Sequence, residues 1–163
     1  PFDLSRWDLP RLRRAVLTLC ELEMWQVHKT RITETPDDFS DGLRAFIRYG
    51  GKLDPDDVSE AETRIACFHE DWTQAMAALS AVVLPTTACA SFVHHERRPQ
   101  NTADLTSIAS ATGLPALSLP VPVSSDAMPV GLQLVGTAAA DRELLRIAEE
   151  LEALLNRTVA PAG

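Results

Sequence analysis

The residues best placed to form a polar binding site are Asp104, Thr106 and Ser110, which precede a short apolar segment. On a helix, Thr106 and Ser110 are four positions apart and therefore share one face. Their helix leads into Gly113, and small or polar residues beside the end of a buried strand often border the ligand crevice of an α/β protein. We expect these side chains to lie near such a crevice; the alternative is that they only cap and pack the helix.

The familiar nucleophile and phosphate motifs are absent from the sequence. It contains no G-x-S-x-G nucleophile elbow and no G-x-x-x-x-G-K phosphate loop. Chain order alone does not exclude a Ser-His-Asp triad, because its members meet only in space. Ser124 and Ser125 lie in an expected turn without flanking glycines, and we interpret them as polar turn residues.

A lysine base is also poorly supported. The chain has two lysines, Lys29 and Lys52. A lysine must be desolvated or placed beside a cation to lose its proton near neutral pH. Lys29 is expected near a helix end and Lys52 after a double glycine, both in water. The sequence therefore assigns no catalytic residue to this chain.

Metal ligands are not indicated either. His94 and His95 are adjacent in an expected loop, and adjacent residues rarely converge on one ion; no His/Cys/Asp/Glu spacing matches a zinc site. His28 and His69 are expected to be partly exposed helix residues. We predict no metal site and no cofactor.

Composition narrows the class of protein. The chain has 163 residues, is 45% hydrophobic and carries a net charge of −8. It is long enough for one domain with a core, and its acidity argues against nucleic acid or an anionic membrane as a partner. No run of 18 apolar residues is present. Three cysteines without paired spacing favour a reduced, cytoplasmic setting.

The first half of the sequence predicts three helices. One begins near Pro10, and a second runs from Pro36, capped by Thr35, to the double glycine that starts at Gly50. A third begins at Pro55 after Asp54 and carries an apolar residue at every third or fourth position: Val58, Ala61, Ile65, Phe68, Trp72, Ala75, Met76 and Leu79.

The second half predicts a sheet. Short apolar runs at 81–84, 116–119 and 130–135 are typical of buried strands, the first two closed by Pro85 and Pro120 and the third by Gly136. A helix at 102–112, ended by Gly113, separates the first two strands, which we therefore expect to be parallel. Asp141 should cap a final helix.

The predicted fold class is α/β, with three N-terminal helices followed by a strand–helix–strand–strand–helix unit. We interpret residues 1–163 as a single partial domain, in which residues 1–80 form a helical layer and 81–157 the sheet-forming layer. A sheet of only about three strands would leave unpaired edges. We therefore expect further strands of the sheet to come from missing sequence or from a partner. The chain begins with Pro1 and lacks an initiator methionine, which favours a start within a longer protein.

Two paired motifs carry a family resemblance. GLPALSLP at Gly113–Pro120, followed by MPVGLQLVG at Met128–Gly136, resembles the C-terminal signature of the amidase signature family. Three further segments resemble the same family and extend the match over roughly residues 40–155: Ser59–Arg64, Val82–Thr86 and Asp141–Leu155.

The resemblance implies a mixed sheet wrapped by helices and a hydrolase that cleaves carboxamides through a Ser–cis-Ser–Lys set. Those catalytic residues belong to the family's Gly/Ser-rich N-terminal portion, which has no counterpart here. The scaffold residues that carry over are Pro85, Gly113, Pro115, Pro120, Gly131 and Gln133. The candidates for the substrate pocket are Thr86, Asp104, Thr106 and Ser110.

Ser110 departs from the family pattern, because relatives often have asparagine there, and this leaves the substrate class open. The expected partners are a missing N-terminal catalytic portion of the same protein and a small amide substrate. Two other functions remain open. One is a stand-alone, non-catalytic domain that self-associates, for example as a homodimer, and the other is the amide-hydrolysing subunit of a tRNA-dependent amidotransferase.

Overall fold

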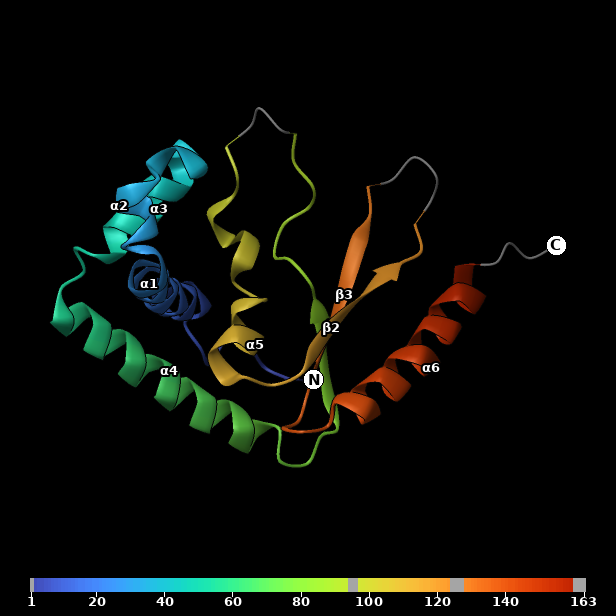
Figure 1. Cartoon of the computed structure of the whole chain (residues 1–163). Coiled ribbons are helices and arrows are strands. Elements are labelled where there is room, and N and C mark those ends of the chain that lie inside the picture. The colour runs from blue at the N-terminus through green and yellow to red at the C-terminus, as the bar shows by residue number, and fades with distance from the viewer. Residues whose placement is uncertain (1, 94–96, 124–127, 160–163) are drawn as a thin grey trace.

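The computed structural model describes residues 2–93, 97–123 and 128–159. These residues form three layers, in which a small sheet lies between one C-terminal helix and a group of helices on the other face (Figure 1). The α/β class predicted from the sequence is therefore confirmed. In the described part of the chain, no helix is long and apolar enough to cross a membrane.

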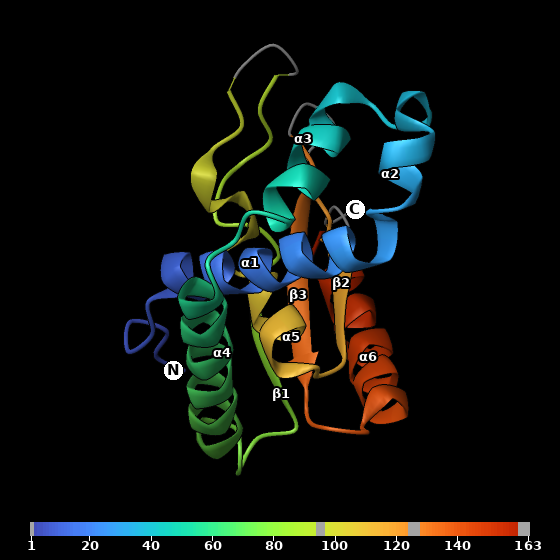
Figure 2. The same cartoon turned by 60° about the vertical axis from the view of Figure 1, so that its left-hand side comes forward.

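Helix α1 spans Leu9–His28 and begins as the sequence indicates. The Asp8 side chain accepts a hydrogen bond from the Arg11 N–H at 3.0 Å, and a proline occupies the first turn. Both features suit a helix start, where backbone N–H groups lack partners within the helix. Figure 2 shows α1 running across the direction of the strands.

The second predicted helix is divided in the structure, which corrects the expected start at Pro36. A short helix α2 (Arg31–Glu34) and a 3-10 turn η1 (Pro36–Asp38) come first. Asp38 accepts hydrogen bonds from Thr35 Oγ1 at 2.9 Å and from Arg31 at 3.2 Å. Such local side-chain bonds compete with helix continuation.

Helix α3 then spans Asp41–Gly50. Ser40 caps this helix, because its hydroxyl accepts from the Leu43 N–H at 3.4 Å. Phe39, just before the cap, is in extended conformation, so the chain re-enters the helix only at this point. The end of α3 at Gly50 agrees with the prediction.

Helix α4 (Pro55–Ala75) confirms the predicted cap at Asp54, whose carboxylate accepts from the Asp56 N–H at 2.9 Å. The apolar stripe is also confirmed in part. Ala61, Phe68, Trp72 and Met76 are buried, whereas Leu79 lies beyond the end of the helix and is 41% exposed. The apolar pattern therefore predicted an end of the helix that lies beyond the observed end at Ala75.

The sheet has the order β1-β3-β2, with β1 at Ala81–Pro85, β2 at Ala116–Val121 and β3 at Val130–Gly136. Both outer strands pair antiparallel with β3. They therefore run in the same direction, as predicted, but β3 lies between them. Pro120 does not end its strand; on an edge strand, the missing N–H of a proline can face away from the ladder.

The two faces of the sheet pack against different helices. Val82 and Val135 join a core with α1, α4 and α5, a short helix at Ser107–Thr112. On the opposite face, Leu134 packs against Leu144 and Ala148 of α6 (Asp141–Val159). Val83 is 49% exposed, so β1 is not the fully buried strand that its apolar run predicted.

The predicted helix at 102–112 is also divided. A 3-10 turn η2 (Gln100–Ala103) precedes α5, and Gly113 ends α5 in the left-handed conformation with φ of 67°. That conformation suits glycine and confirms its predicted role. Helix α6 begins at Asp141 itself, and Ala140 accepts the first helical bond from the Leu144 N–H. Asp141 is therefore a first-turn residue and not the cap.

Candidate functional site

Three residues, one from or just after each strand, meet near the end of the sheet where β1 ends and β3 begins. The Thr86 N–H, just after β1, donates to the Gly131 carbonyl of β3 at 2.9 Å. The Thr86 Oγ1 lies 2.5 Å from the Ser118 Oγ of β2. The outer strands are thus hydrogen-bonded to one another across the central strand.

Gly131 makes this contact possible because it has no side chain. A Cβ atom at this position would lie 2.6 Å from Thr86 Oγ1 and 2.9 Å from Ser118 Oγ. Both distances are shorter than real Cβ contacts, so any larger residue would push the two hydroxyls apart. Thr86 and Gly131 are each singled out by the sequence, but Ser118 is not, since their meeting depends on the register of all three strands.

A hollow of about 460 Å³ opens beside this contact, and we call it the strand-end hollow. It is lined by residues 87–92, Thr102 and residues 129–131. Its size falls within the usual range for small-molecule sites, roughly 300–1,000 Å³. Gly131 therefore belongs both to the strand contact and to the wall of the hollow.

Asp104 lies away from the strand-end hollow. It is buried, and its carboxylate accepts a hydrogen bond from the Arg13 Nε of α1 at 2.6 Å. This partly buried ion pair joins the segment before α5 to α1. The placement matches the alternative that the sequence left open, in which Asp104 serves packing.

Thr106 and Ser110 share one face of the α5 region, as their spacing predicts. Both line a groove of about 280 Å³ between α1 and α5. Thr102 lines this groove and the strand-end hollow, so the two spaces adjoin. Cys20 also lines the groove; burial raises the pKa of its thiol, and the nearby carboxylates of Glu23 and Glu21 raise it further.

Gln133 has a positioning role that its buried location explains. Its side chain is 4% exposed, and its Nε2 donates to the Leu105 carbonyl at 3.2 Å. This bond ties the central strand to the residues before α5. Behind α5, the Gly136 N–H donates to the Pro115 carbonyl at 2.9 Å, which fixes the entry to β2. These scaffold residues together hold α5 over the sheet.

The two scaffold prolines lie in the edge strands near the same end of the sheet. Pro85 is paired in register with Leu132, and Pro120 with Gly131. Both residues are exposed. They therefore flank the end of β3 from which the strand-end hollow opens.

The remaining candidates that the structure describes do not join this site. Lys29, Lys52 and His69 are exposed, and His28 is half-buried. Within residues 2–93, 97–123 and 128–159, no group of three or more His, Cys, Asp or Glu side chains could hold a metal ion. Two pairs considered as candidates lie outside the described residues: His94 and His95, and Ser124 and Ser125.

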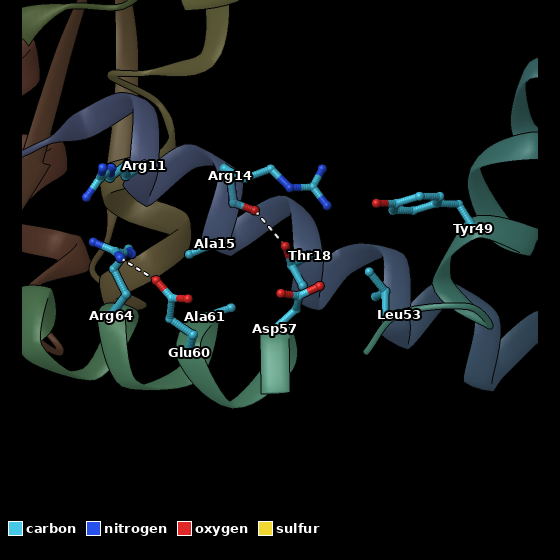
Figure 3. A pocket seen from close by; sticks show the side chains of 10 residues that line it. All are labelled: Arg11, Arg14, Ala15, Thr18, Tyr49, Leu53, Asp57, Glu60, Ala61 and Arg64. Carbon is cyan, nitrogen blue, oxygen red and sulfur yellow. Dashed lines mark hydrogen bonds and ion pairs between the residues drawn. The ribbon is translucent and has the colours of Figure 1, made fainter. Parts of the chain in front are cut away.

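A second hollow of about 460 Å³ lies between α1 and α4, far along the helical layer (Figure 3). Three arginines line it: Arg11, Arg14 and Arg64. Each has a carboxylate partner, with distances of 3.3 Å to Asp8, 2.7 Å to Glu21 and 2.7 Å to Glu60, respectively. The guanidinium charges are already balanced, so this hollow does not favour an anionic ligand.

Comparison with known proteins gives a family and a fold. The model of the amidase family matches residues 23–145. A crystal structure of an amidase superposes on 90% of this chain with a TM-score of 0.77 and 25% identity, and 6-aminohexanoate cyclic dimer hydrolase on 85% with a TM-score of 0.63 and 19% identity. The matches cover 36% and 33% of those chains.

Two relatives in sequence are glutamyl-tRNA(Gln) amidotransferase subunits. The mitochondrial protein of Rattus norvegicus is 38% identical over 63 residues, which are 37% of this chain and 12% of that protein. Its counterpart from Rickettsia bellii is 33% identical over 89 residues, 52% of this chain and 18% of that protein. The chain thus spans only a small part of these relatives. The family model nevertheless covers more than half of the chain and includes both paired motifs, Gly113–Pro120 and Met128–Gly136, so the chain belongs to the amidase signature family.

Proposed function

We propose that this chain forms the C-terminal part of a hydrolase that cleaves the C–N bond of carboxamides, and that its Ser–cis-Ser–Lys catalytic residues lie outside this chain. The observation that carries the proposal is the amidase superposition, which covers 90% of this chain but 36% of the amidase. In the implied mechanism, lysine deprotonates a bridging serine, which activates the nucleophilic serine. The serine oxygen bonds to the amide carbonyl carbon, the C–N bond breaks as the leaving amine or ammonia takes up a proton, and water then hydrolyses the acyl-enzyme to release the acid.

Within that enzyme, this chain supplies sheet and one wall of the substrate pocket. In the described residues, the outer edges of β1 and β2 have no strand partner. An N-terminal catalytic portion that pairs there would cover edges that otherwise invite association. The strand-end hollow lies beside Thr86 and Gly131, at the end of the sheet where β1 ends and β3 begins.

The positions of the lysines support catalytic residues elsewhere. Both Lys29 and Lys52 are exposed, whereas a lysine base needs burial or a neighbouring cation to be neutral near pH 7. For the cell compartment we propose the cytoplasm, because the three cysteines are free and form no disulfide.

The test compares this chain with the complete protein that contains it. We expect the complete protein to release ammonia from a simple amide such as hexanamide, and the 163-residue chain to release none. Ammonia release by the chain alone, at a rate proportional to its concentration, would overturn the placement of the catalytic residues.

A second candidate is supported by the relatives in sequence. The glutamyl-tRNA(Gln) amidotransferase subunit of Rattus norvegicus is 38% identical over the matched segment. If this chain belongs to such a subunit, the complete protein would hydrolyse glutamine, and its partner would use the ammonia. Rates with glutamine and with hexanamide separate the two candidates: a simple amidase prefers hexanamide, and an amidotransferase prefers glutamine.

A further inference from the structure

We propose that the catalytic portion of the complete protein seats a helix on the sheet face beside α6 and pairs a strand with the outer edge of β1. The inference rests on the proposed function, because it names the surface of this chain that the catalytic portion covers. It follows from the position of α6, the apolar residues that α6 leaves exposed and the direction of the β1 N–H groups.

Helix α6 covers only two of the three strands. Its main contacts with the sheet are to β2 and β3, and in both views most of it lies on the β2 side (Figure 1 and Figure 2). Of the described β1 residues, Ala81 alone joins the core beneath α6. A helix is roughly 10 Å wide and neighbouring strands are about 4.8 Å apart, so one helix covers about two strands. The face of β1 is therefore left for a second helix.

The strip that α6 leaves uncovered is apolar. Val83 of β1 is in register with Leu134, which packs beneath α6, so the two side chains share a face. Pro85 and Leu132 are the next pair on this face, and Val130 follows by the alternation of β3. Val83 is 49% exposed and Val130 is 51% exposed. We call Val83, Pro85, Val130 and Leu132 the uncovered sheet face.

A second exposed strip, on β2, does not suit a helix. Ala116, Ser118 and Pro120 are exposed. They alternate with Leu117 and Leu119, which pack beneath α6, so they lie on the opposite face of the sheet. Alanine and serine offer little apolar area to bury. The uncovered sheet face over β1 is therefore the surface on which a helix gains most by docking.

The outer edge of β1 lies directly beside this face and carries backbone donors. The Thr86 N–H points toward β3, because it donates to the Gly131 carbonyl at 2.9 Å. The direction of the N–H groups alternates along a strand, so those of Ala81 and Val83 point away from β3. Pro85 has no N–H to add. Such an edge is a template for another strand, so the sheet can continue at β1.

The helix and the strand belong together for a geometric reason. A helix seated over β1 is about two strands wide, so half of its width extends beyond the β1 edge. A strand paired with that edge fills the space beneath it. The superposed amidase matches this chain over only 36% of its own length, so the rest of such a protein is long enough to supply both elements.

A second copy of this chain does not satisfy the same surface. Two copies paired antiparallel through their β1 edges would be related by a two-fold axis normal to the sheet. The α6 helix of each copy would still lie over its own β2 and β3. Both uncovered sheet faces would then remain exposed at the centre of the joined sheet, which favours the catalytic portion as the occupant.

The test measures access to position 83 in the 163-residue chain and in the complete protein. Val83→Cys is treated with a maleimide, and peptide mapping separates the new thiol from the exposed native Cys20 and Cys67. Reaction in urea gives the intrinsic rate. We expect fast labelling in the isolated chain and labelling slower by about 100-fold or more in the complete protein, where the thiol reacts only when the interface opens.

Val82→Cys is the matched control, because Val82 is the neighbouring residue on the opposite face and is 3% exposed in this chain. Its thiol should label slowly in both proteins. Hydrogen exchange tests the strand separately. The Ala81 and Val83 amides should exchange freely in the isolated chain and be protected by about 100-fold or more in the complete protein.

The outcomes separate the surface from the chemistry. Equal labelling of Val83→Cys in the two proteins would overturn the inference, and so would protection in the isolated chain that rises with its concentration, the mark of a second copy. Fast exchange of the Val83 amide in the complete protein would contradict the paired strand. None of these results changes whether the complete protein releases ammonia, whereas ammonia release by the chain alone would sink the proposed function and leave the labelling rates intact.

Discussion

At the residue scale, position 131 requires glycine because no side chain fits between Thr86 and Ser118. Its backbone leaves room for the Thr86 and Ser118 hydroxyls to approach to 2.5 Å, and a Cβ would lie within 3 Å of both. The contact therefore depends on the absence of a side chain at this position of the central strand. It also explains why the glycine stands between two apolar residues in a strand, where glycine usually weakens the structure.

We predict that Gly131→Ala lowers the free energy of unfolding by about 1–3 kcal/mol, the usual cost of overpacking. Urea unfolding of the purified chain measures this change. Gly42→Ala is the matched control, because a Cβ at Gly42 in α3 meets nothing within 4 Å and alanine favours a helix. Equal stability of Gly131→Ala and the unsubstituted chain would contradict the account.

At the element scale, α5 is fastened to the sheet by Gln133. The amide of this residue is buried and donates to the Leu105 carbonyl, while the Asp104–Arg13 ion pair holds the same segment to α1. Helix α5 has only six residues and would not be stable alone. Its position beside the strand-end hollow therefore depends on these contacts.

Replacing Gln133 by methionine keeps the length of the side chain and removes the donor. We predict a loss of about 1–3 kcal/mol, because the buried Leu105 carbonyl would lose the Gln133 donor and keep only the longer bond from the Ile108 N–H at 3.4 Å. Hydrogen exchange should show lower protection of the α5 amides, with α6 unaffected. Gln26→Met, at an exposed position of α1, is the control. Unchanged protection of α5 would show that Gln133 does not hold it.

Local signals predicted much of the element pattern. The cap at Asp54 and the left-handed Gly113 are confirmed, because each depends on residues close in sequence. The start at Pro36 was wrong because Asp38 bonds locally to Thr35, and the end at Pro120 was wrong because β2 is an edge strand. Such outcomes depend on neighbours that a linear pattern does not show.

The candidate site was less predictable than the elements. Thr106 and Ser110 share a face as predicted from their spacing, yet they line a groove with α1 and not the strand-end hollow. Ser118 was missed because its contact with Thr86 requires the register of both outer strands against β3. Sequence patterns give residue types, whereas a site also needs this long-range pairing.

At the scale of the whole molecule, the sheet divides two cores of unequal size. The larger core joins α1, α4 and α5 to one face, and the smaller joins α6 to the other. Among the described residues the sheet has two unpaired outer edges, and the chain spans about a third of two solved structures that it matches, an amidase and 6-aminohexanoate cyclic dimer hydrolase. This arrangement is the basis for proposing that the catalytic residues lie elsewhere.

The most direct test of that claim is reaction of the purified chain with a fluorophosphonate probe, which labels activated serines, followed by intact mass measurement. A full-length amidase of the family that carries the Ser–cis-Ser–Lys set is the positive control. We predict no adduct on this chain under conditions that fully label the control. A stoichiometric adduct on one serine would contradict the account and would identify a nucleophile within these 163 residues.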